Sequence, residues 1–222
     1  MEKHTAAVFD LDGTLLDSLT VWSRVDREFL RRRGLEVPPD YTETVSAMSF
    51  TEAARYTVGR FALPEAPEEL IREWNGMVAR EYAQRIALKP GARECLRVLE
   101  ERGVRLGVAT ALPEELYGPA LKHNGIYGCF GAFASVTETA RGKGFPDVYL
   151  LCAERLGVTP GSCAVFEDVL PGLIGAKAAG MNAVGVYDEN SNLCEKDALS
   201  VGDGYVRSLE ELTEEKFYRK FF

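Results

Sequence analysis

Short apolar runs alternate with longer amphipathic stretches through most of this 222-residue chain. Five runs have the length of buried strands: residues 6–9, 104–110, 132–136, 163–166 and 183–187. Three of the stretches between them begin after a proline and end at a glycine, as helices do: 90–103, 146–157 and 171–180. Strands that are separated by helices of this length pair in parallel. The alternation therefore predicts an α/β fold with a doubly wound, Rossmann-like parallel sheet.

A different pattern interrupts this alternation between residues 18 and 87. The segment shows helical periodicity only, with Leu19, Trp22, Val25, Phe29 and Leu30 on one face. Proline-containing turns at 38–40 and 64–67 separate its helices. We therefore expect residues 18–87 to form an inserted all-α domain, and residues 1–17 and 88–222 to form the α/β core.

Charge excludes some classes of partner. The net charge of −8 argues against nucleic acid, which is bound mainly through clustered Lys and Arg. The one dense basic run, Arg31 to Arg33, precedes Gly34 and is interpreted as a solvated helix end. No apolar run approaches the ~20 residues of a membrane span, and the strand pattern follows the first four residues directly. We expect a cytoplasmic protein with no membrane partner.

Cysteine and histidine patterns exclude further chemistry. The five cysteines lack CxxC spacing, so neither a zinc site nor a disulfide framework is indicated. Neither of the two histidines has a plausible nucleophile beside it. A Ser–His or Cys–His hydrolase is therefore disfavoured.

The most informative segment is FDLDGTLLDS, at residues 9–18. Asp10 comes at the end of the first expected strand and Asp12 just past it, and ligands of open α/β sheets bind at such strand ends. Buried acids are costly unless a cation or hydrogen-bond donors compensate them. Two carboxylates beside a glycine turn therefore indicate a divalent ion, and an all-oxygen site suits Mg²⁺. The structural alternative is that both acids only cap the turn into a helix.

Four segments in order resemble the motifs of the haloacid-dehalogenase-like superfamily, in its β-phosphoglucomutase-like and phosphoglycolate phosphatase-like branch. FDLDGTLLDS resembles the first motif in its DxDGTxxDS phosphatase form. The others are VRLGVAT at 104–110, RGKGFPD at 141–147, and FED at 166–168, continuing through Gly172 to AAGM at 178–181. The resemblance covers nearly all of residues 5–188, and the insert has the place of the family's helical cap.

The resemblance implies a role for each acid. Asp10 would be the nucleophile that forms an aspartyl phosphate. Asp12 would protonate the leaving oxygen and then activate water, while its backbone carbonyl completes the metal shell. Asp168 would be a second carboxylate ligand of Mg²⁺. Glu167 would bind the metal through water or orient the site from outside.

The resemblance also places Lys143 and Thr110 on the transferring phosphoryl group, one by charge and one by hydrogen bond. Leu11, Asp12 and Ala111 would complete the phosphate site. Two positions depart from the family pattern. Gly144 stands where proline usually follows the lysine, which frees the local backbone. Ala111 stands where Ser or Asn is common, which removes one polar contact.

Several activities share this architecture. A sugar phosphomutase must hold a second phosphate with basic cap residues, but alignment gives Ala47 and Thr51 at those positions, and Trp22 in place of a cap histidine. These residues favour hydrolysis over mutase activity. A dehalogenase would lack the Asp12 equivalent. A protein that keeps the fold but only binds a phosphorylated ligand is the alternative from another class.

The cap is expected to close over the site and select the leaving group. Trp22, Met48, Phe50 and Thr51 are the candidates for this lining. Because they are largely apolar and uncharged, the expected substrate is a small, singly phosphorylated metabolite, such as a sugar phosphate.

Overall fold

The computed structural model describes residues 5–46, 48 and 50–222. The chain divides into two compact units. The α/β unit comprises the described residues up to Leu19 together with Ile86–Phe222, and the helical unit comprises Thr20–Arg85. The expected boundaries, 17/18 and 87/88, lie two residues from these. Ala47, which entered the comparison with mutases, lies outside the described residues.

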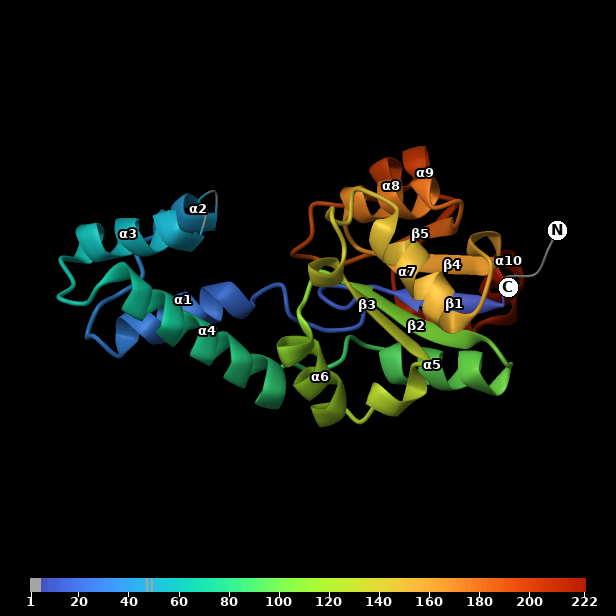
Figure 1. The fold of residues 1–222 in the computed structure, drawn as a ribbon, viewed down its shortest axis with the longest axis horizontal. Helices are drawn as coiled ribbons and strands as arrows, with labels where there is room; N and C mark the ends of the chain where they lie inside the picture. The colour runs from blue at the N-terminus through green and yellow to red at the C-terminus, as the bar shows by residue number, and fades with distance from the viewer. Residues whose placement is uncertain (1–4, 47, 49) are drawn as a thin grey trace. The chain divides into compact units, whose positions relative to one another are not determined.

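The α/β unit contains a six-stranded sheet in the order β3-β2-β1-β4-β5-β6, and every pairing is parallel (Figure 1). The strands are β1 (Ala6–Phe9), β2 (Arg105–Thr110), β3 (Ala132–Ser135), β4 (Cys163–Glu167), β5 (Asn182–Val186) and β6 (Gly204–Val206). The predicted doubly wound parallel sheet is confirmed. β6 was not expected, because a three-residue edge strand carries too little apolar pattern to be recognised.

The helices of this unit are α5 (Ala92–Glu101), α6 (Glu114–His123), α7 (Asp147–Leu156), α8 (Leu170–Ala178), α9 (Glu195–Val201) and α10 (Glu215–Phe221). Shorter 3₁₀ turns are Tyr127–Cys129, Val136–Glu138, Pro160–Ser162 and Leu209–Thr213. The three helices expected between proline and glycine are α5, α7 and α8. α7 ends at Gly157, whose φ of 66° is the left-handed conformation that glycine adopts most easily.

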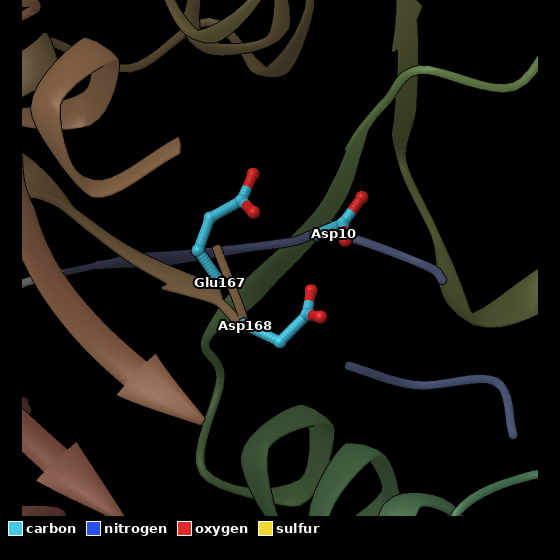
Figure 2. Close-up of side chains that lie close together, drawn as sticks. All are labelled: Asp10, Glu167 and Asp168. Carbon is cyan, nitrogen blue, oxygen red and sulfur yellow. The ribbon is translucent and has the colours of Figure 1, made fainter. Parts of the chain in front are cut away.

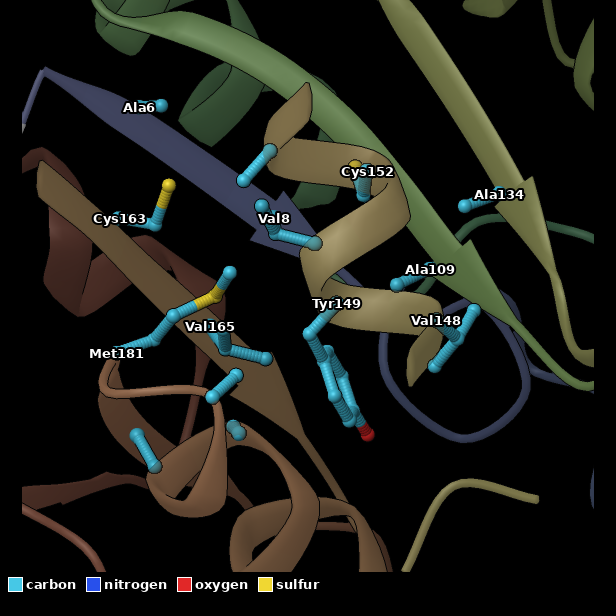
Figure 3. Close-up of a cluster of buried hydrophobic side chains, with 14 of the residues drawn as sticks. Ala6, Val8, Ala109, Ala134, Val148, Tyr149, Cys152, Cys163, Val165 and Met181 are labelled. Carbon is cyan, nitrogen blue, oxygen red and sulfur yellow. The ribbon is translucent and has the colours of Figure 1, made fainter. Parts of the chain in front are cut away.

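The two central strands, β1 and β4, are buried on both faces. Val8 and Val165 pack on one face with residues of α7 and α8, as Figure 3 shows. Successive side chains of a strand alternate between faces, so Phe9 and Phe166 lie on the other face, where their rings stack 4.8 Å apart. Phe221 contacts Phe166 there, with ring centroids 6.4 Å apart. Packing on both sides fixes the ends of β1 and β4, where the expected site residues begin.

The helical unit consists of α1 (Val21–Arg31), α2 (Tyr41–Ser46), α3 (Phe50–Phe61) and α4 (Pro67–Gln84). α1 and α4 run antiparallel, because Arg24 pairs with Glu81 while Arg32 lies near Glu73. Their shared core includes an edge-to-face contact between Phe29 and Trp74. No helix among the described residues is both long enough and apolar enough to cross a membrane.

The interpretation of the Arg31 to Arg33 run as a solvated helix end was wrong for Arg33. This side chain is 18% exposed and forms 2.7 Å ion pairs with both Glu65 and Glu73. Its guanidinium also stacks over the Phe29 ring at 3.8 Å. Arg33 therefore joins α1 to α4, a role that depends on acids about 30 to 40 residues further along the chain.

Candidate active site

Three buried carboxylates meet at the carboxyl ends of β1 and β4 (Figure 2). The register pairs Phe9 with Phe166, so the residues that follow, Asp10 and Glu167, lie side by side. Asp168 comes next in the chain. One carboxylate oxygen from each residue lies within 4.8 Å of the others, and the residues are 4%, 0% and 1% exposed. Glu167 thus belongs to the same cluster as the two aspartates.

Lys143 brings a positive charge to this cluster. Its Nζ donates to Glu167 Oε1 at 2.7 Å and also forms an ion pair with Asp10 Oδ1. Gly144 therefore does not prevent the lysine from reaching the carboxylates. The Lys143 backbone packs closely on α8, where a Cβ at Gly175 would lie 2.0 Å from the Lys143 carbonyl oxygen. A larger residue at position 175 would push this segment away.

Tyr149 is a site residue that the sequence interpretation missed. It projects from α7, within the apolar cluster of Figure 3, and its hydroxyl donates to Glu167 Oε1 at 2.7 Å. Burial, reinforced by the Glu167 charge, raises the pKa of Tyr149, so the phenol stays a hydrogen-bond donor. In the sequence Tyr149 belongs to an apolar helix face, and nothing there distinguishes it from a core aromatic.

The cluster contains three carboxylates and one lysine, so it has an excess of negative charge, and its carboxylates are buried. Burial, and then the charges of Asp10 and Glu167, raise the pKa of Asp168 to about 8. Burial also raises the pKa of Glu167 to about 7, against the opposing effect of Lys143. Burial acts to lower the pKa of Lys143, but the neighbouring carboxylates outweigh it and the net pKa is raised. The lysine is therefore a permanent cation.

Two oxygens of the cluster are buried without a hydrogen-bond partner among the described residues: Glu167 Oε2 and Asp168 Oδ2. The other Asp168 oxygen accepts a 3.2 Å hydrogen bond from Thr14. Gly13, with φ of 77°, allows the chain to pass so closely that a Cβ there would lie 2.3 Å from Asp168 Oδ2. Orphaned anionic oxygens among three carboxylates and one lysine fit a hard divalent cation.

The Asp12 side chain lies outside this three-carboxylate cluster. Its Oδ1 accepts a 2.5 Å hydrogen bond from Ser18 Oγ, and the residue is only half-buried. The loop that follows Asp10 and contains Asp12 is tight, because the Leu11 carbonyl accepts hydrogen bonds from the amides of residues 14, 15 and 16. Ser18 is 1% exposed and held by the fold, so it orients the Asp12 carboxyl.

The remaining residues expected at the phosphate lie at the same end of the sheet. Thr110 is the last residue of β2 and is fully buried. Because β2 pairs Val108 with Phe9, Thr110 is level with Leu11 in the loop that follows β1. Its hydroxyl oxygen accepts a 3.1 Å hydrogen bond from the Leu112 amide, which leaves the proton available for donation. Ala111 follows and is exposed.

In the helical unit, Trp22, Met48 and Phe50 line one cavity of about 280 Å³. Thr51, expected with them, is exposed and is not part of this lining. Sequence interpretation missed Asp26, one turn beyond Trp22 on α1, which also lines the cavity. Burial raises the pKa of Asp26 to about 6, against a hydrogen bond from Thr42 that lowers it. The described lining of this cavity is mostly apolar and includes one buried carboxyl.

A doubly wound sheet that holds buried acids and a lysine at its central strand ends defines an α/β enzyme with a carboxylate-rich site. Comparison with known proteins gives the family. The model of the haloacid dehalogenase-like hydrolases matches residues 4–180, so the chain belongs to that family.

Curated relatives are similar over almost their whole length. Hexitol phosphatase B of Escherichia coli K12 is 29% identical, with 94% of each chain covered. A probable pseudouridine-5'-phosphatase of Drosophila melanogaster is 30% identical, covering 98% of this chain and 95% of the relative. Validoxylamine A 7'-phosphate phosphatase of Streptomyces hygroscopicus is 29% identical, covering 94% and 96%.

Solved structures share the fold. A Thermotoga maritima structure has a TM-score of 0.87 at 24% identity and covers 98% of this chain and 99% of its own. CbbY from Rhodobacter sphaeroides, solved in complex with phosphate, has a TM-score of 0.71 at 25% identity, covering 94% and 96%. With the family match and the named phosphatases, these findings make the chain a phosphoric monoester hydrolase that acts on a phosphorylated small molecule.

Proposed function

We propose that this protein is a magnesium-dependent phosphatase that hydrolyses a small phosphomonoester, such as a sugar phosphate, through an aspartyl phosphate on Asp10. The observation that carries the proposal is the cluster of Asp10, Glu167, Asp168 and Lys143 at the ends of β1 and β4. Its orphaned carboxylate oxygens fit a divalent cation, and its lysine fits a phosphoryl group.

In the first half-reaction, an Asp10 carboxylate oxygen attacks phosphorus in line with the ester oxygen. The phosphorus–ester bond breaks as Asp12 donates its proton to the departing oxygen. In the second half-reaction, Asp12 takes a proton from water, whose oxygen attacks phosphorus. The acyl phosphate bond then breaks, which releases inorganic phosphate and restores Asp10. The Ser18 hydrogen bond supports this role, because it holds the Asp12 carboxyl apart from the three-carboxylate cluster.

Other groups stabilise the charge on the transferring phosphoryl group. Lys143 supplies a cation, Thr110 a hydroxyl donor, and the loop residues Leu11, Asp12 and Ala111 line the phosphate site. Mg²⁺ would be held by Asp10, Asp168 and the Asp12 carbonyl, with Glu167 acting through water or as an orienting partner. When bound, it neutralises charge on the nucleophile and the phosphoryl oxygens.

The cavity of the helical unit supports a substrate with a single phosphate. Its described lining contains Asp26 but no Lys or Arg, so a second phosphate would find no counter-charge there. Apolar rings such as Trp22 and Phe50 suit the C–H faces of a sugar or another polyol. The named relatives act on a hexitol phosphate, a pseudouridine phosphate and validoxylamine A 7'-phosphate, which supports a polyol-like leaving group.

Phosphate release from a panel of phosphomonoesters tests the proposal. Wild type with Mg²⁺ should release phosphate, and Asp10→Asn or a chelator should abolish release. Asp40→Asn, which changes an exposed aspartate of the helical unit, is the control and should retain activity. Mg²⁺ should raise the melting temperature of wild type but not of Asp168→Asn, because binding only to the folded state stabilises it.

Two outcomes would contradict the proposal. Isomerisation of a sugar phosphate, dependent on a bisphosphate activator and without phosphate release, would assign a mutase. Tight binding of phosphate esters with no turnover at any metal concentration would assign a binding protein.

A further inference from the structure

The helical unit has a second cavity, also of about 280 Å³, which shares no lining residue with the apolar one. It lies between α1 and α4. Its lining contains six arginines: Arg24, Arg27, Arg31, Arg32, Arg80 and Arg85. The acidic residues of the lining are Glu28 and Glu81. We call this cavity the arginine groove, and its lining carries an excess of four positive charges.

The two glutamates organise the arginines but do not neutralise them. Glu28 accepts hydrogen bonds from both Arg31 and Arg32, each at 2.9 Å. Glu81 accepts from Arg24 at 3.0 Å and from Arg85 at 2.9 Å. Because each carboxylate holds two guanidinium groups, neither glutamate by itself neutralises its two arginines. Arg32 also lies 3.8 Å from Glu73, which is outside the lining.

Arg27 and Arg80 add two further charges. Both side chains are exposed, and neither has an ion-pair partner among the described residues. The antiparallel pairing of Arg24 with Glu81 sets the register of the two helices, so Arg27 and Arg80 lie within about one turn of this contact, on facing helices. Two unpaired arginines therefore line the groove beside the glutamate-held pairs.

The arginine groove is positively charged although the protein as a whole is acidic. The protein has a net charge of −8, and residues 20–85 contain ten arginines and no lysine. Six of those ten line one groove. Like charges held this close repel one another unless an anion occupies the space between them. Arginine is also the side chain whose planar fork matches phosphate oxygens in pairs.

The dimensions limit the kind of anion. A cavity of about 280 Å³ holds a small molecule, not a folded partner or a nucleic acid duplex. Along α1, the seven helical steps from Arg24 to Arg31 rise about 10 Å, so a single phosphate group does not contact both glutamate-held arginine groups.

We propose that the arginine groove binds a small anion that carries at least two phosphate groups, at a site separate from the carboxylate cluster of the α/β unit. Arg27 and Arg80 contact its phosphate oxygens directly. The positive electrostatic potential around the anion comes from the other arginines of the lining, Arg24, Arg31, Arg32 and Arg85. The inference does not depend on the proposed phosphatase mechanism, because it uses none of its residues.

Isothermal titration with pyrophosphate, in buffer with chelator and without Mg²⁺, tests the site. Arg27→Ala/Arg80→Ala should bind pyrophosphate about tenfold more weakly than wild type or worse, since charge-assisted hydrogen bonds are lost. Arg55→Ala/Arg72→Ala is the matched control: it removes the same charge from exposed arginines outside the groove and should bind like wild type. Lys143→Ala should also bind like wild type.

Other variants keep the test decisive. Arg27→Lys/Arg80→Lys preserves charge and folding but cannot make paired contacts, so it should also weaken binding. Inorganic phosphate should bind at least about tenfold more weakly than pyrophosphate. The proposal is overturned if pyrophosphate does not bind, if both double alanine variants weaken binding equally, if only Lys143→Ala loses it, or if DNA binds more tightly than pyrophosphate.

Discussion

Replacing Asp26 by asparagine should stabilise the helical unit, by an amount that depends on pH. Burial raises the pKa of Asp26 from 3.8 to about 6 in the folded protein, and the residue is 7% exposed. Asparagine has nearly the same shape and can still accept the hydrogen bond from Thr42. The substitution therefore removes the ionisation of the side chain and little else.

The magnitude follows from proton linkage. Below pH 3.8, Asp26 is protonated in both the folded and unfolded states and costs no stability. As pH rises toward about 6, the unfolded chain releases its proton while the folded chain retains it, so wild type loses stability. Above about pH 6 the loss is complete. One pKa unit is worth about 1.4 kcal/mol, so the loss reaches about 3 kcal/mol.

The two tryptophans of the chain make this measurable. Trp22 and Trp74 both belong to the helical unit and line the cavity that contains Asp26. Urea unfolding followed by tryptophan fluorescence therefore reports on this unit. Between pH 4 and 7, the free energy of unfolding of Asp26→Asn relative to wild type should increase by up to about 3 kcal/mol.

Asp40→Asn is the control, because Arg60 holds the pKa of Asp40 below its ordinary value. The free energy of unfolding of Asp40→Asn should not rise relative to that of wild type over the same pH range. A difference in free energy of unfolding between wild type and Asp26→Asn that stays constant from pH 4 to 7 would refute the reasoning. It would mean that Asp26 has the same pKa in the folded and unfolded states.

Two further predictions concern the α/β unit. Gly175→Ala should lower kcat/KM for phosphate release by about tenfold or more, because its Cβ would displace the Lys143 segment. Gly161→Ala is the control, because a Cβ at that position would lie in open space. Equal kcat/KM values for the two variants would contradict this packing argument. Ser18→Ala should lower kcat more than it raises KM, because it releases the Asp12 carboxyl. A change confined to KM would assign Ser18 to substrate binding instead.

Local sequence patterns predicted much of the sheet. The four central strands and β3 each appear as an apolar run, because strands covered by helices on both faces need side chains that are apolar on both sides. The helices bounded by proline and glycine were equally recognisable. Short elements were not, since β6, α9 and α10 depend on packing against neighbours that are distant in sequence.

Asp10 and Asp12 could be selected as site candidates because they come at and just past the end of an apolar strand, where a charge needs a reason to be buried. The family resemblance added Asp168. Lys143 is different from Asp10 and Asp12. Taken alone, its surroundings in the sequence are those of a surface loop, and its ion pair with Asp10 joins residues 133 positions apart. The family resemblance, not a physical rule, selected it.

The sequence by itself determined the parallel α/β fold and the placing of acids at strand ends, because periodicity and turn chemistry act over a few neighbouring residues. Only the tertiary structure decided which side chains meet. It brought Tyr149 to Glu167, placed Asp26 in an apolar cavity, and aligned the arginines of α1 with those of α4. Such contacts depend on register and packing between distant segments, which no local pattern encodes.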